Sequence, residues 1–148
     1  MDPRPPSHVE FLAPYPDAVQ EVAYAARAIL YDRFAPISEI FYDATQAVCL
    51  GFTYTDHERN NFINLAVYAN HVSLIFPYGA QLDDPEGRLK GTGTRVHHTR
   101  LIGVEDLEDR YLTGLIEQAR RRAVTPNEPL PETIIVKSMR GPKRRPTV

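Results

Sequence analysis

The chain has 148 residues, 43% of them hydrophobic, and a formal net charge of -2, which fits one globular domain. The small net charge argues against a surface-wide field for nucleic acid or a membrane. Cys49 is the only cysteine, which excludes an internal disulfide and a cysteine zinc cluster and favours a reducing, cytoplasmic setting. We expect no membrane contact, because no run of about 18 apolar residues and no secretory signal occurs.

Two amphipathic helices are predicted at the two ends of a central region. Residues 1–14 are rich in proline and predict an extended lead-in. The first helix is predicted over 14–34, where Pro16 suits the first helical position and apolar residues recur every three or four positions. The second is predicted over about 104–124, because acidic residues open it and three arginines close it, as the helix dipole favours.

Five short runs between these helices predict strands, because β-branched and aromatic residues dominate them. Two of the runs are separated only by Ala69 and Asn70, which predicts a hairpin. The five predicted strands cover residues 39–43, 47–54, 62–68, 71–76 and 95–102.

We therefore predict an α+β fold, a two-layer sandwich in which two helices pack on one face of an antiparallel sheet of four to five strands. The domain is expected at residues 15–125. Residues 126–148 are expected to form a proline-rich linker, a short apolar segment and a basic tail. The tail offers weak phosphate contacts, so nucleic acid is not expected as a main partner.

The stretch 79–101 is dense in glycine, charge and histidine, and we expect a ligand there if the protein has one. Eighteen residues, 77–94, lack a regular pattern, and connections of this length are often functional. A Gly-Thr-Gly turn can offer backbone N–H groups to an anion, although the same glycines also suit a tight turn into a strand. The residues of this anion site would be Lys90, Gly91, Gly93 and Arg95.

Metal and nucleophile chemistry have little support in the sequence. His97 and His98 are neighbours on a predicted strand, so they point to opposite faces and cannot chelate one ion. Cys49 lies in an apolar strand pattern and is expected to be an inert core residue. An enzyme, which we consider less favoured than a binding protein, would need a pocket with titratable groups. The candidate residues for it are Tyr42, Asp43, His71 and His97.

Several segments resemble the YdhG-like family, a group of small bacterial domains of unknown function. They are EIFYD, HVSLIF and YGAQLDDPEGRLKGTGTRVHHTRL, and the resemblance spans residues 10–125. It implies a frataxin-like sandwich of helix, antiparallel sheet and helix. Some relatives are described as iron chaperones that hold ferrous iron on acids of the first helix and first strand. By position, the resemblance implies iron ligands at Asp17, Glu21, Glu39 and Asp43.

Two functions remain open from the sequence. The first is a non-enzymatic binding module that contacts a partner protein through the sheet face without helices. The second is a frataxin-like intracellular iron chaperone that uses the four carboxylates named above. The absence of a nucleophile–base motif favours the first.

Overall fold

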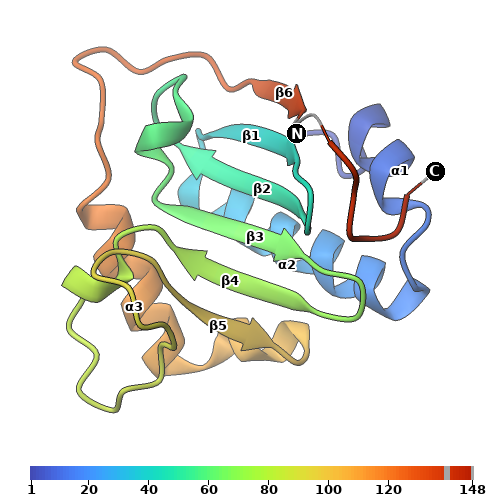
Figure 1. Cartoon of the computed structure of the whole chain (residues 1–148). Helices are drawn as coiled ribbons and strands as arrows, with labels where there is room; N and C mark the ends of the chain where they lie inside the picture. Colours follow the sequence, from blue (N-terminus) through green and yellow to red (C-terminus); the bar gives the residue numbers. More distant parts are fainter. Residues whose placement is uncertain (139–140, 148) are drawn as a thin grey trace.

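The computed structural model describes residues 1–138 and 141–147, which form three helices and a six-stranded sheet (Figure 1). The sheet order is β5-β4-β3-β2-β1-β6, and the long helix over Asp17–Phe34 runs behind it in the view shown. The helices are α1 (Pro6–Leu12), α2 (Asp17–Phe34) and α3 (Arg110–Arg121), with short 3-10 helices η1 (Glu58–Asn60), η2 (Gly79–Gln81) and η3 (Val104–Glu108). The strands are β1 (Ser38–Asp43), β2 (Val48–Thr53), β3 (Ile63–Val67), β4 (Val72–Phe76), β5 (His97–Leu101) and β6 (Ile134–Ser138).

The five strands predicted over 39–102 are confirmed as β1 to β5, and each pairs antiparallel with the next along the chain. The predicted hairpin joins β3 and β4, with Val67 opposite Val72. Alternate residues of each strand point to the helices and form one continuous core, because successive side chains of a strand face opposite ways. The helix-facing core side chains of β1 to β4 are Phe41, Val48, Leu50, Phe52, Ile63, Leu65, Val67, Val72, Leu74 and Phe76.

The main covering helix is α2, as predicted, and its small residues let it approach the sheet closely. Ala23, Ala26 and Leu30 are fully buried at the spacing of one helix face. Within the described residues, no helix is both long and apolar enough to cross a membrane. The prediction of an α+β sandwich is therefore confirmed at the level of helices packed on a mostly antiparallel sheet.

The N-terminal segment differs from the prediction of an extended lead-in, because Pro6–Leu12 form helix α1. Proline is tolerated in the first helical turn, where its missing N–H would have no partner, so the prolines start this helix rather than prevent it. Leu12 is fully buried, and the ring of Phe11 packs 5.8 Å from that of Phe41. The described part of the chain thus has three helices on the sheet instead of the predicted two.

The C-terminal apolar segment also differs from the prediction, which placed it outside the domain. Residues 134–138 form β6, which pairs parallel with β1, so that Phe41 lies opposite Val136. A sheet edge presents unpaired N–H and C=O groups, and β6 satisfies those of β1. The sheet is therefore mixed and six-stranded, not antiparallel with four to five strands.

The second predicted helix starts later than expected. The side chain of Asp109 accepts a hydrogen bond from the N–H of Tyr111 and caps α3, which therefore begins at Arg110. The preceding acidic residues form η3 instead, where Asp106 accepts the N–H of Ile102 at 2.8 Å. The acidic residues thus lie in η3 and at the N-cap of α3, and the first turn of α3 itself contains none.

A buried ionic network joins α1, α2 and β1. Glu39 is fully buried and accepts hydrogen bonds from Arg27 Nη2 at 2.8 Å, from His8 Nε2 at 2.9 Å and from the Tyr31 hydroxyl at 2.9 Å. Arg27, only 1% exposed, also donates from Nη1 to the carbonyl of Asp2 at 2.8 Å. Every charged group in the network therefore has a partner, as burial of charge requires.

The network keeps Glu39 ionised. Burial by itself raises the pKa of Glu39, but the hydrogen bonds and charges of His8 and Arg27 outweigh it and hold that pKa below 4.5. A carboxylate whose pKa is lower in the folded state stabilises the fold above its unfolded pKa. This contribution to the free energy of unfolding is lost as the pH falls below about 4.5.

The basic tail folds back on the end of β1. Arg145 forms an ion pair with Asp43, and its Nε donates to the carbonyl of Ala44 at 2.7 Å. The hydroxyl of Ser138 donates to Asp43 Oδ2 at 2.7 Å. Lys143 Nζ lies 3.7 Å from the same oxygen. Two of the tail's cations therefore bind within the chain, which leaves them unavailable for the phosphate contacts considered from the sequence.

We expect Arg27→Met to lower the free energy of unfolding by about 3–5 kcal/mol, because it leaves the buried Glu39 carboxylate without its main counter-charge. The double variant Arg27→Met/Glu39→Gln should recover most of this loss, since glutamine is neutral and still accepts from His8 and Tyr31. Urea unfolding followed by circular dichroism measures both. A loss below about 1 kcal/mol in the single variant would contradict the role given to the network.

Arg145→Ala should lower the free energy of unfolding by about 1–3 kcal/mol, since it removes the ion pair to the buried Asp43 carboxylate and the hydrogen bond to the carbonyl of Ala44. Arg144→Ala is the matched control, because within the described residues Arg144 is exposed and bonds through its backbone N–H, to Thr45 O at 2.7 Å. The control should stay within about 0.5 kcal/mol of the wild type in the same urea titration. Equal effects of the two substitutions would show that the tail contributes no specific contact.

Candidate ligand pocket

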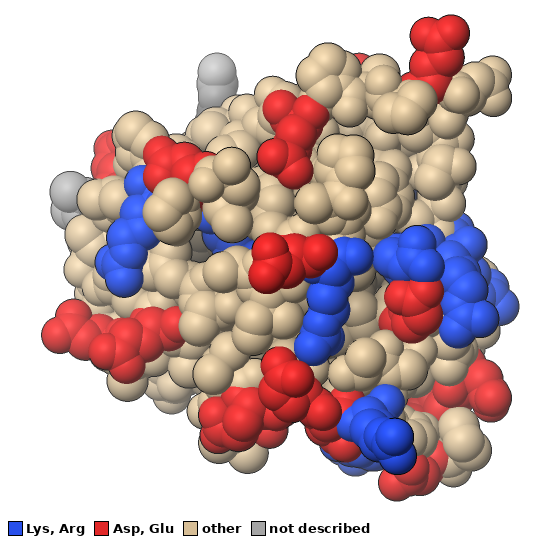
Figure 2. Space-filling view, turned by 180° about the vertical axis from the view of Figure 1, so that it is seen from behind, with Lys and Arg blue, Asp and Glu red and all other residues tan. Residues whose placement is uncertain are grey.

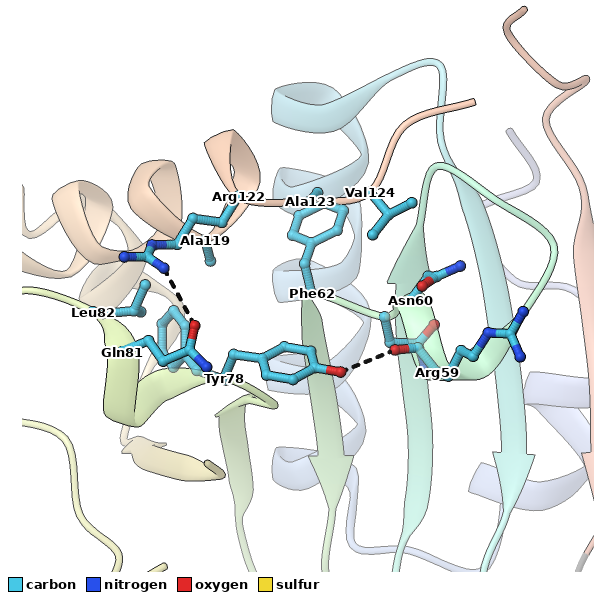
Figure 3. A pocket seen from close by; sticks show the side chains of 12 residues that line it. Arg59, Asn60, Phe62, Tyr78, Gln81, Leu82, Ala119, Arg122, Ala123 and Val124 are labelled. Atoms are coloured by element: carbon cyan, nitrogen blue, oxygen red, sulfur yellow. Dashed lines mark hydrogen bonds between the residues drawn. The ribbon is translucent and has the colours of Figure 1, made fainter. Parts of the chain in front are cut away.

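A pocket of about 350 Å³ lies at the end of the sheet where β3 begins and β4 ends (Figure 3). Its walls come from η1, η2 and the last turn of α3, three segments far apart in the sequence. Ligand pockets commonly measure about 300–1,000 Å³, so this one has the size for a small molecule. The residues that line it are Arg59, Asn60, Asn61, Phe62, Phe76, Tyr78, Gln81, Leu82, Ala119, Arg122, Ala123 and Val124.

The interior of this α3-end pocket is apolar. Phe62 and Phe76 are buried residues next to the ends of β3 and β4, and Leu82 and Ala119 close the side toward α3. The ring of Tyr78, by contrast, is 41% exposed and lies along one wall, with its hydroxyl donating to the carbonyl of Arg59 at 3.5 Å. An apolar interior with a few polar groups at the rim is the usual composition of a small-molecule site.

Two arginines give the rim of the pocket positive charge. Figure 3 shows their guanidinium groups at opposite ends of the pocket, with Arg122 beside Gln81. Arg122 Nη1 donates to Gln81 Oε1 at 3.3 Å, which is a single bond to a neutral acceptor. No aspartate or glutamate is among the described residues that line the pocket.

The η1 wall is held by local hydrogen bonds. His57 Nδ1 accepts the N–H of Arg59 at 3.0 Å and starts η1. Asn61 Nδ2 donates to Asn64 Oδ1 at 3.1 Å, and this pair lies over Gly51 of β2. A Cβ at position 51 would come within 2.0 Å of Asn61 Nδ2, so only glycine leaves room for this arrangement.

The connection between β4 and β5, which the sequence singled out, is folded against α3. Asp84 accepts the N–H groups of Arg88 at 3.0 Å and Leu89 at 2.9 Å, and it also accepts the hydroxyl of Tyr111. These bonds outweigh the effect of burial and hold the pKa of Asp84 below its usual range. Asp84 is thus an ionised turn residue rather than an acid catalyst. Gln118 exchanges two hydrogen bonds with the backbone of Asp83, at 2.8 and 3.0 Å.

The anion site predicted at the other end of this connection does not coincide with the pocket. The backbones of Lys90 and His98 form an isolated bridge, and the ring Nε2 of His97 lies 3.0 Å from the carbonyl of Gly93. Gly91 has a φ of 137°, which favours glycine and fits the turn considered as the alternative. The predicted residues Lys90, Gly91, Gly93, Arg95 and His97 are not among those that line the pocket.

The candidates for an enzymatic site do not come together, because two lie on β1 and the other two at opposite ends of the β4–β5 pair. Tyr42 belongs to β1, and Asp43 at its end is bound by the tail. His71 precedes β4 and stacks on Tyr68 with ring centres 4.7 Å apart. Partial burial lowers the pKa of His71, and Arg100 and His98 lower it further. His97 lies at the opposite end of the β4–β5 pair, where it pairs with Phe76.

The four carboxylates implied as iron ligands do not form one ligand set. Asp17 and Glu21 are exposed on α2, whereas Glu39 is buried and bound to Arg27 and His8. Asp43 is bound to the tail through Arg145. Across residues 1–138 and 141–147, no group of three or more His, Cys, Asp or Glu side chains is arranged to hold a metal ion.

A scan against protein-family models, a search of curated proteins and a search of solved structures each found no match to this chain. The resemblance to the YdhG-like family therefore stays a prediction. The stretch 79–101, where the sequence predicted a ligand, supplies Gln81 and Leu82 to the pocket, but the other lining residues come from separate segments that form no motif. Tyr78 also lies in the irregular stretch 77–94 that the sequence singled out.

The single thiol, Cys49, should react slowly. Burial raises the pKa of Cys49 to about 11, two units above the ordinary value of 9.0, so its thiolate fraction at pH 8 is about 100-fold below that of a free thiol. Iodoacetamide labelling, followed by mass spectrometry, should proceed about 100-fold slower than labelling of free cysteine and should accelerate in denaturant. A rate within threefold or so of free cysteine would show that the thiol is accessible and activated.

Proposed function

We propose that this protein is a non-catalytic binding module that takes a small, mainly apolar ligand in the α3-end pocket. The observation that carries the proposal is the pocket, a cavity of about 350 Å³ whose walls include the exposed Tyr78 and Val124 and the half-buried Ala123. Apolar surface that stays in contact with water is a source of binding free energy when a ligand covers it.

The side chains around the pocket favour binding over catalysis. The described residues that line it include no His, Cys, Ser, Lys, Asp or Glu, so no nucleophile lies beside a general base. Tyr78 is the only side chain there with a hydroxyl, and it donates to a backbone carbonyl. An acid–base reaction needs a group whose proton can move to a reacting atom, and the lining supplies none with that arrangement.

The sequence predicted contact with a partner protein through the sheet face without helices. The residues on that face make it a less favourable contact surface. It carries small or buried residues such as Gly51, Ala66 and Ser73 along its centre. In β1 to β5 no large hydrophobic side chain on this face is exposed, whereas contact surfaces for proteins commonly present such side chains. The partner-protein function therefore stays a prediction without a structural observation in its favour.

Ala123→Trp should abolish ligand binding in the pocket, because Ala123 is a half-buried lining residue and the indole would occupy the cavity. The probe is 2-naphthamide, a neutral bicyclic molecule. Its roughly 13 heavy atoms at about 0.3 kcal/mol each give a Kd of about 1 mM for the wild type. Amide chemical shifts, followed by NMR during titration, measure binding and locate it.

Ala28→Trp is the matched control, since Ala28 is exposed on α2 and does not line the pocket. The control should bind the probe as the wild type does. If 2-naphthamide shifts no resonances of the pocket in the wild type, or shifts them equally in Ala123→Trp, the proposed function is wrong.

A further inference from the structure

The positive charge at the rim of the α3-end pocket indicates which chemical class of ligand the pocket binds. Figure 2 shows acidic and basic side chains interspersed on the helix-covered side, with the largest group of basic side chains at the edge where α3 lies in Figure 1. The sequence of α3 ends in three arginines, of which Arg120 and Arg121 form ion pairs with Glu117. Arg122, the one that lines the pocket, has no acidic partner among the described residues.

Arg59, the second cation at the rim, also lacks an acidic partner among the described residues. Arg59 forms no ion pair within the described part of the chain, and its position is fixed through its backbone, which bonds to His57 and to Tyr78. The nearest acidic residue in sequence, Glu58, is paired with Lys137 at 3.4 Å. The rim thus carries two positive charges next to an apolar interior, without a compensating negative charge in the lining.

We propose that the ligand is a small organic carboxylate, in which an apolar, planar body fills the interior and the carboxylate binds Arg122. This inference rests on the proposed function. A carboxylate accepts two parallel hydrogen bonds from a guanidinium, which is stronger than the single bond at 3.3 Å from Arg122 to Gln81. The carboxylate would therefore displace the Gln81 amide as the acceptor.

The shape of the pocket agrees with a flat body rather than a branched one. The exposed ring of Tyr78 lies along one wall of the pocket in Figure 3, and aromatic rings stack favourably on planar ligands. The volume of about 350 Å³ is at the small end of the range for ligand pockets, which favours one or two rings over a nucleotide or a lipid chain.

The test compares two probes of the same shape, 2-naphthoate and the neutral 2-naphthamide, by NMR-monitored titration of the full chain. Wild type should bind the carboxylate about tenfold more tightly than the amide, as charge-assisted hydrogen bonds are the stronger kind. Arg122→Gln should remove this preference, so that the two probes bind this variant equally. Arg121→Gln is the matched control, since Arg121 is the exposed neighbour that does not line the pocket, and it should change neither affinity.

Other results of these titrations would contradict the proposed ligand class or the proposed function. If both probes bind the wild type equally, or if Arg122→Gln keeps the preference for the carboxylate, the ligand class is wrong while the pocket remains a binding site. If inorganic phosphate displaces 2-naphthoate at equal concentration, the rim is a general anion site and the apolar body contributes nothing. If neither probe binds, the proposed function fails together with this inference.

Discussion

The arrangement of the N-terminal half depends on the hydrogen bonds that the buried carboxylate of Glu39 accepts. It lies on the helix-facing side of β1, where the neighbouring positions are apolar, and a charge can stay there only with partners. Those partners come from two helices, Arg27 and Tyr31 from α2 and His8 from α1. Because Arg27 also binds the carbonyl of Asp2, the same network holds the N-terminal residues against the domain.

A second carboxylate of the same strand, Asp43, has the corresponding role at the C-terminal end. It binds Ser138 of β6 and Arg145 of the tail, so both chain termini are bound to β1 through acidic side chains. These two residues were also two of the four implied iron ligands. In the structure their negative charge is balanced by cations of the chain itself, which removes the free oxygen ligands that ferrous iron requires.

The α3-end pocket lies where β3 begins and β4 ends, and contacts other than those of Glu39 and Asp43 hold its walls. The η1 wall depends on Asn61 over Gly51, and the wall from η2 depends on the contacts of Asp83 and Asp84 with α3. Walls held in this way lose little conformational entropy when a ligand binds, which favours a small ligand that can offer only limited contact area. Under the proposed ligand class, the positive charge of the rim would favour a carboxylate over a neutral ligand of similar shape.

The sequence by itself determined the five central strands, the hairpin at Ala69 and Asn70, and the apolar residues that face the helices, because these follow from short-range periodicity and turn chemistry. Helix α1, strand β6, the pairing of Arg27 with Glu39 and the pocket were decided by the tertiary structure. Each joins residues whose spacing in the chain carries no pattern, such as Arg59, Tyr78 and Arg122 around one cavity. Periodicity shows which side of an element is buried, but the partner that buries it is chosen by the packing of the whole chain.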